Sequence, residues 1–212
     1  MSIIVANPVP ISLEDIDDMA QAARGKISRL YLHWTAGHYQ HVYDAYHLSI
    51  TGDGKIYSPA DGDIPEAFLI HRSHTYQRNT GAIGIALCCS YKASFNACGE
   101  IDPGPEPPTS LQIETLARVV AHIIHYLGLD LNSTVVQTHY EVAKQDGYGP
   151  GSLDPDMRWD LWFLDGKPYR KGLYPGGEVL RGKASYYLEN DFGRRGEVQQ
   201  EWQLTRPCLN AA

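Results

Sequence analysis

Three polar residues of the chain are candidates to hold a metal ion: His33, His139 and Asp154. His33 and His139 lie at the ends of extended, largely apolar runs, and Asp154 lies in the Gly/Pro-rich loop that follows His139. Catalytic zinc takes three protein ligands and keeps a fourth position for water, and two imidazoles with one carboxylate form such a set. Pro155 restricts Asp154 to extended backbone, which suits a ligand presented from a fixed loop. Nine histidines allow many such triples, so spacing alone does not select this one.

Short strands are predicted to deliver the two histidines. RLYLHW (29–34) places His33 at its end, and STVVQTHY (133–140) places His139 at its end. Residues 82–90, AIGIALCCS, form a continuous apolar run, which is typical of a central strand covered on both faces. The extended runs on either side of Asp53-Gly54 predict a hairpin, because a DG turn between apolar alternations is a strong local signal.

Two amphipathic helices are predicted to pack on this sheet. Residues 11–24 form the first, with Ser12 as its N-cap. Apolar residues recur at three- and four-residue intervals over 111–127, and Thr109 with Gln112 makes a capping box before them. The order of elements predicts an α/β fold: a single domain with a central mixed β-sheet flanked by helices.

The composition changes near residue 165, which predicts a catalytic domain over 1–164 and a C-terminal extension over 165–212. Residues 1–164 carry 10 Lys+Arg and 19 Asp+Glu (−9), whereas 165–212 carry 8 and 6 (+2). We expect one hairpin around 183–200 in the extension. A basic extension is suited to contact an anionic polymer, although a solvated surface gives the same pattern.

The bulk properties exclude several classes of function. A formal net charge of −7 argues against nucleic-acid binding. No apolar stretch approaches the ~20 residues that span a bilayer, so no membrane insertion is expected. The first 18 residues lack a basic segment and a long apolar core, so we expect synthesis in the cytoplasm without a signal peptide. The adjacent Cys88 and Cys89 are expected to be buried thiols rather than metal ligands or a disulfide.

Five motifs occur together in one order over residues 27–164. They are LHWTAG (32–37), YHLSITGDGKIY (46–57), HTYQRNTGAIGIAL (74–87), THYEVA (138–143) and LDPDMRWDLW (153–162). In this order they resemble the zinc-dependent N-acetylmuramoyl-L-alanine amidases of the peptidoglycan recognition protein superfamily. The resemblance implies that fold, Zn²⁺ held by His33, His139 and Asp154, and hydrolysis of the amide between N-acetylmuramic acid and L-alanine. The implied partner is peptidoglycan or a muropeptide; the sequence gives no oligomeric state.

The resemblance also assigns catalytic roles around the metal. Tyr46 matches a tyrosine that stabilises the developing oxyanion in phage-type enzymes, although a hairpin tyrosine packed on the sheet is an equal alternative. His74 and Asn79 match residues that line the substrate groove, and His74 is a candidate to donate to the substrate. Glu141 matches the acidic residue of the second histidine motif, suited to orient a ligand or cap the following turn.

The remaining predicted site residues shape the cleft, and two of them depart from the family pattern. Trp34 and Thr35 are predicted in the cleft wall, with core packing favoured for Trp34. Ala86 stands where recycling-type relatives carry a general-base glutamate. Ser152, predicted to contact substrate, stands where many relatives carry a lysine that steadies the oxyanion. Tyr46, His74 or Lys144 are candidates to compensate.

Three functions compete at this stage. The first is a zinc amidase acting as a phage or prophage endolysin after holin-type release, with a recycling enzyme or an exported effector as alternatives. The second is a binding module of the same fold that grips muropeptides without cutting them. The third is a cysteine hydrolase using Cys88 or Cys89, which is disfavoured because an apolar strand offers no positive charge to form a thiolate.

Overall fold

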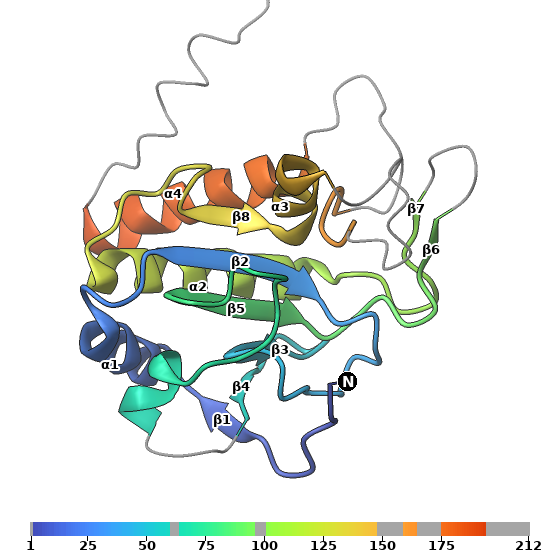
Figure 1. Ribbon diagram of the computed structural model, residues 1–212, viewed down its shortest axis with the longest axis horizontal. Helices are drawn as coiled ribbons and strands as arrows, with labels where there is room; N and C mark the ends of the chain where they lie inside the picture. The colour runs from blue at the N-terminus through green and yellow to red at the C-terminus, as the bar shows by residue number, and fades with distance from the viewer. Residues whose placement is uncertain (1, 60–63, 96–100, 148–158, 165–174, 194–212) are drawn as a thin grey trace, which may run out of the picture.

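The computed structural model describes residues 2–59, 64–95, 101–147, 159–164 and 175–193, and its centre is a six-stranded sheet (Figure 1). The strand order is β1-β4-β3-β5-β2-β8. Strands β3, β5, β2 and β8 run parallel, whereas β4 is antiparallel to both of its neighbours. The strands are β1 (Val9–Ile11), β2 (Arg29–Trp34), β3 (Leu48–Ile50), β4 (Ile56–Ser58), β5 (Ala82–Leu87) and β8 (Val136–Thr138), with a separate pair β6 (Ser94–Phe95) and β7 (Ile101–Asp102).

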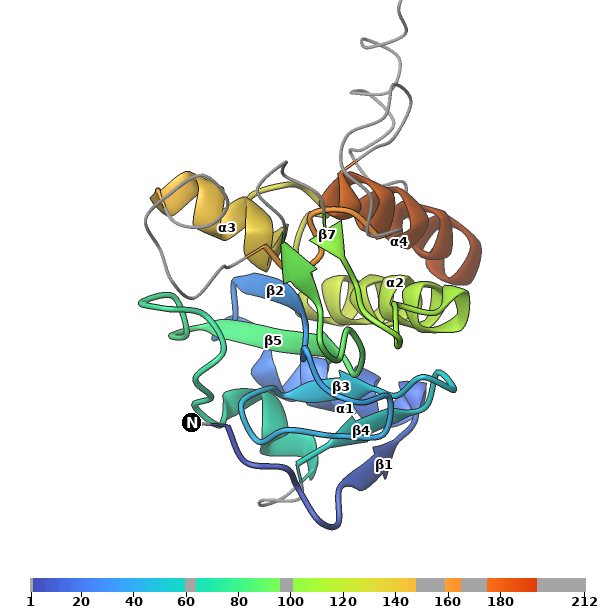
Figure 2. The ribbon, with the colours of Figure 1, turned by 90° about the vertical axis from the view of Figure 1, so that its right-hand side faces the viewer.

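Helices cover both faces of this sheet, as an α/β fold requires. In Figure 2, α2 and α4 lie together on one side, and α3 lies apart from them. The helices are α1 (Leu13–Ala23), α2 (Ser110–Leu127), α3 (His139–Asp146) and α4 (Gly176–Phe192), with a short 3-10 helix η1 (Ile64–Leu69). The predicted fold class, a mixed sheet flanked by helices, is confirmed. None of the described helices is long and apolar enough to cross a membrane.

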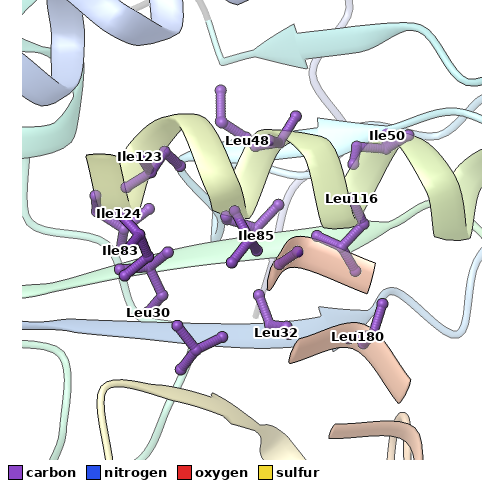
Figure 3. Packing of buried hydrophobic residues seen from close by; sticks show 14 of the residues in the cluster. Leu30, Leu32, Leu48, Ile50, Ile83, Ile85, Leu116, Ile123, Ile124 and Leu180 are labelled. Carbon is purple, nitrogen blue, oxygen red and sulfur yellow. The ribbon is translucent and has the colours of Figure 1, made fainter. Parts of the chain in front are cut away.

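The core lies between the sheet and α2, and β2 and β5, each paired with a neighbour on both sides, contribute to it. Every residue of β5 is buried, as expected for a strand covered on both faces. Leu30 and Leu32 of β2 pack with residues of α2 in the main cluster (Figure 3). Successive side chains of a strand point to opposite faces. Tyr31 therefore belongs to a second cluster, with Val142 of α3, on the other face.

The local signals for the first two helices are confirmed. The Ser12 side chain accepts from the backbone N–H of Asp15 in a capping box at the start of α1. Thr109 and Gln112 form the same motif at α2. Gly128 ends α2 with a φ of +70°, a left-handed conformation that favours glycine. The hairpin around Asp53-Gly54 is also present, as the antiparallel pair β3–β4.

Two predictions about individual elements need correction, the first in the C-terminal region. Residues 183–192 belong to helix α4, so the hairpin predicted around 183–200 is wrong there, and 194–200 lie outside the described residues. Leu180, Ala184 and Leu188 supply the apolar face that the sequence hid, because glycines and charges interrupt its periodicity. Their burial places α4 in the main core. The division of the chain at residue 165 into two units stays a prediction.

The second correction concerns the strand predicted over 133–140. It spans only Val136–Thr138, and His139 is the first residue of helix α3. Thr138 is the N-cap of this helix, and it forms a capping box with Glu141. The Thr-x-x-Glu pattern that begins at Thr138 is a signal for the start of a helix. The strand and loop predicted here did not take it into account.

Candidate metal centre

His33 is the fifth residue of β2 and points to the face of the sheet opposite α2. This follows from its register, one residue beyond Leu32 of the main core. Its ring is 1% exposed. Because the parallel strands β2 and β8 are neighbours, their carboxyl ends meet at one edge of the sheet. His33 and the residue that follows β8, His139, therefore come together, with ring centroids 4.6 Å apart.

A carboxylate bridges the two imidazoles, and it belongs to Asp160. The Asp160 Oδ2 atom lies 3.2 Å from His33 Nδ1, and Oδ1 lies 2.8 Å from His139 Nδ1. A ligand atom from each of the three residues falls within 4.8 Å of the others. The backbone N–H of Tyr140 donates to the Asp160 carbonyl, which ties this segment to the start of α3. These three side chains form the candidate metal centre.

The charge states of these groups match what a metal ion requires. Burial lowers the pKa of His33, which favours the neutral imidazole. Burial alone would raise the pKa of Asp160, but His139 and His33 hold it below its ordinary value, so the carboxylate stays ionised. Metal ligands of these types bind as neutral imidazole and as carboxylate. The donor set therefore fits a divalent ion such as Zn²⁺.

A chain of hydrogen-bonding groups extends from the far side of the His33 ring. His33 Nε2 lies 3.3 Å from Thr75 Oγ1, which lies 3.0 Å from His74 Nδ1. The His74 ring lies over Gly84 of β5, where a Cβ would come within 2.4 Å of it. Burial and the neighbouring histidines lower the pKa of His74 to about 2, so this ring is neutral. Thr75 and His74 therefore lie behind a candidate metal-binding imidazole, a place from which a ligand's tautomer and orientation can be set.

Tyr46 lies beside His33, with ring centroids 5.2 Å apart. Burial raises the pKa of its phenol, and the charge of Asp160 adds to that effect. The phenol therefore keeps its proton and is a hydrogen-bond donor at the centre. This geometry is compatible with the predicted role at the oxyanion, which stays a prediction.

The structure places the other predicted site residues in supporting positions. Asn79 Oδ1 accepts from the backbone N–H groups of His74 and Thr75, so its side chain organises their loop. Trp34 packs edge-on against Trp159 in the core. Thr35 Oγ1 accepts from the backbone N–H of Gly37 and of Cys89. The contacts of these three side chains are thus within the protein.

Glu141 has contacts on two sides and lies outside the group of three candidate metal ligands. It caps the start of α3, and it forms an ion pair with Arg181 of α4. A carboxylate held in this way is suited to positioning rather than to proton transfer. Lys144 lies in the last turn of α3.

Asp154 and Ser152 lie outside the described residues, so their predicted roles stay predictions. Ala86 is described: it pairs in register with His33 of β2 and is fully buried. The position at which some relatives carry a glutamate is thus adjacent to the metal centre and has no polar group in this chain.

The two described cysteines are unsuited to nucleophilic catalysis. Cys88 and Cys89 are buried, and neither forms a disulfide. Burial raises the pKa of the Cys88 thiol to about 12, and it raises the pKa of Cys89 as well. The reactive thiolate is therefore disfavoured at neutral pH.

Sequence reasoning missed Asp160 and Thr75. Asp160 lies in the RWDLWFL segment, between residues that bury their side chains, and a single acidic residue in an apolar segment was the available signal. Thr75 follows His74 directly, but no periodicity marks a loop threonine as the neighbour of a distant histidine.

The geometry defines a class of protein before any comparison. A buried imidazole, a partly buried one and a carboxylate converge at the carboxyl edge of parallel strands, an arrangement that fits a metal-dependent hydrolase. The family model for N-acetylmuramoyl-L-alanine amidase matches residues 23–152, more than half of the chain. The chain belongs to this family, and its activity is that of a peptidoglycan amidase. The match contains His33 and His139 and ends before both Asp154 and Asp160.

One solved structure similar to this chain is the endolysin N-acetylmuramoyl-L-alanine amidase LysCS from Clostridium intestinale. The TM-score is 0.39 at 15% sequence identity, and the match covers 72% of this chain and 82% of that chain. A comparison with curated protein sequences found no match.

Proposed function

We propose that this amidase is zinc-dependent and cleaves the amide between the lactyl group of N-acetylmuramic acid and L-alanine. The observation that carries the proposal is the convergence of His33 and His139, through their Nδ1 atoms, on one carboxylate. When bound there, a divalent ion lowers the pKa of a water molecule and polarises the scissile carbonyl. The family match supplies the substrate class.

The chain's own residues would then bind and orient the reacting groups. His33, His139 and a carboxylate hold the ion. The protonated phenol of Tyr46, next to His33, donates a hydrogen bond to the carbonyl oxygen as negative charge develops on it. Burial of the His33 and Asp160 side chains limits competition from bulk water.

Two carboxylates are candidates for the third metal ligand. Asp160 is the one that contacts both imidazoles, whereas the motif resemblance implies Asp154. Alanine substitution of each distinguishes them, because loss of the third ligand weakens zinc binding far more than loss of a neighbouring acid. Zinc affinity measured by competition with a chromophoric chelator gives the answer.

We further propose that the enzyme acts as an endolysin, reaching the cell wall by holin-type release. The tyrosine beside the metal centre, which the phage-type relatives share, supports this proposal. Expression in the cytoplasm with and without a holin tests it, since lysis is expected only with the holin. Lysis without the holin contradicts that route, as does no lysis with it when the extracted protein is active on isolated walls.

The reaction itself is tested by mass spectrometry of a peptidoglycan digest. We expect new free L-alanine N-termini, no new reducing sugar ends, and loss of products on chelation with recovery on adding Zn²⁺. New reducing ends would identify a glycosidase instead. Stoichiometric zinc with no turnover on purified muropeptides would favour a binding module, which the apolar Ala86 beside the centre makes the second candidate.

A further inference from the structure

Helix α4 lies beyond the part of the chain that the family model matches, yet it contacts residues adjacent in sequence to the candidate metal ligands. Its residue Arg181 is 7% exposed and points toward the junction of β8 and α3. The guanidinium donates to three acceptors there: the Val136 carbonyl at 3.0 Å and both carboxylate oxygens of Glu141 at 2.9 Å. A bidentate pair of this kind fixes orientation as well as distance.

Glu141 connects this contact to His139. Its Oε2 atom accepts from the backbone N–H of Thr138 at 2.8 Å, and its own N–H donates to the Thr138 hydroxyl. His139 lies between these two residues and is the first residue of α3. The Glu141 carboxylate therefore hydrogen-bonds both to Arg181 and to the backbone next to His139.

The first two residues of α4 add close contacts to the same region. A Cβ on Gly177 would lie 2.3 Å from Glu141 Oε2, and a Cβ on Gly176 would lie 2.2 Å from the Leu161 carbonyl. The Gly176 N–H also donates to the Trp162 carbonyl at 2.8 Å. Leu161 and Trp162 directly follow Asp160, so α4 supports the segments of two of the three metal-binding side chains.

We propose that Arg181 and the glycine pair of α4 are positioning residues for the metal centre, acting through Glu141 on His139 and through Leu161 and Trp162 on Asp160. This inference rests on the proposed zinc site. It assigns a described part of the C-terminal region to support of the metal centre. Partners that orient a metal ligand typically change metal affinity 10- to 100-fold when removed.

The test compares two α4 variants with two matched controls in the full chain. Arg181→Met removes the bidentate hydrogen bonds to Glu141, and Gly177→Ala forces the Glu141 carboxylate to move. Lys183→Met removes an ion pair between α4 and Glu114 of α2 that is remote from α3. Gly182→Ala adds a Cβ that meets nothing within 4 Å.

Zinc affinity and the NMR signals of the His139 ring in the metal-free protein are the readouts. We expect Arg181→Met and Gly177→Ala to bind zinc at least tenfold more weakly and to shift the His139 signals. Lys183→Met and Gly182→Ala should stay within twofold of wild type. Arg181→Lys, which keeps the charge but not the bidentate geometry, should fall between.

Three outcomes decide the matter. Equal zinc affinity in all folded variants overturns the inference and leaves the proposed zinc site intact. A wild-type chain that binds no zinc overturns both. Removing one partner of a buried ion pair destabilises proteins strongly, so circular dichroism is measured first. If Arg181→Met does not fold, Gly177→Ala against Gly182→Ala gives the answer.

Discussion

The two histidines of the metal centre are held in different ways. His33 belongs to a strand paired on both sides, by β5 and by β8, and its neighbours in sequence are core residues. His139 follows the edge strand of the sheet and begins a helix, and polar contacts hold its backbone. His33 is thus positioned by apolar packing and sheet register, and His139 by a capping box and an ion pair.

This difference separates stability from metal binding. Apolar packing around β2 stabilises the whole fold, so damage there should unfold the chain before it alters the site. Polar contacts hold the backbone around His139, so damage there should alter zinc affinity in the variants that remain folded. Substitutions around His33 and around His139 test whether stability and zinc affinity separate in this way.

The largest effect is expected from the ligands themselves. Alanine in place of His33 or of His139 should abolish both stoichiometric zinc binding and release of L-alanine N-termini, because two donors cannot hold a catalytic ion. Elemental analysis after dialysis and a peptidoglycan digest are the measurements. The exposed His71 is the control position, and its alanine variant should behave as wild type.

A core substitution on β2 should affect stability instead. Leu32→Ala removes a fully buried side chain and should lower the free energy of unfolding by about 2–5 kcal/mol. Zinc affinity of the folded fraction should change less than threefold. Denaturant unfolding and chelator competition check both numbers. A large loss of affinity in folded protein would show that packing and metal binding are coupled on this side.

Thr75 provides an intermediate case, because it contacts His33 from behind. Thr75→Val keeps the shape but removes the hydroxyl next to Nε2, and it should weaken zinc binding by about tenfold. Thr75→Ser restores the hydroxyl and should recover most of the affinity. Nitrogen NMR of the imidazoles in the metal-free protein reports the tautomer. Equal zinc affinity in the Thr75→Val and Thr75→Ser variants would show that the Thr75 hydroxyl does not position His33.

The smallest effect concerns the α2–α4 contact that is remote from the centre. Hydrogen bonding to Lys183 lowers the pKa of Glu114. A carboxyl with a lowered folded-state pKa contributes stability that is fully present above the unfolded-state pKa and is lost as pH falls through the folded-state pKa. Because the pair is partly exposed, we expect less than about 1 kcal/mol.

Denaturant unfolding from pH 7 to pH 3 measures this contribution. The difference between wild type and Glu114→Gln should shrink below pH 4.5, and zinc affinity at pH 7 should be equal in the two proteins. A difference in stability that grows toward acid would contradict the assigned sign.

The parts that the sequence predicted are those governed by local patterns. The strand 29–34 agrees with the structure at both ends, and the Ser12 N-cap and the Thr109–Gln112 capping box are where their residue types indicate. The two histidines come together because parallel strands bring their carboxyl ends to one edge. These features depend on nearest neighbours and on one simple rule of topology.

The parts that the sequence did not predict depend on contacts between distant segments. Asp160 meets His33 across 127 residues, and Arg181 meets Glu141 across 40. Nothing in the local sequence of Asp160 indicates its partners. Helix α4 has a weak apolar periodicity because the polar Arg181 and Ser185 are buried among its apolar residues, Arg181 through its contacts with Glu141 and Val136. Residues whose partners are distant in the sequence are identified only once the three-dimensional structure shows those partners side by side.

The proposed zinc site requires that three side chains converge on one ion at the carboxyl edge of β2 and β8. X-ray diffraction from zinc-soaked crystals at the zinc absorption edge tests this directly. We predict one strong anomalous peak about 2.0–2.1 Å from the Nδ1 atoms of His33 and His139, with a carboxylate oxygen completing the set. A peak elsewhere in the molecule, or no peak in protein that cleaves peptidoglycan, would contradict it.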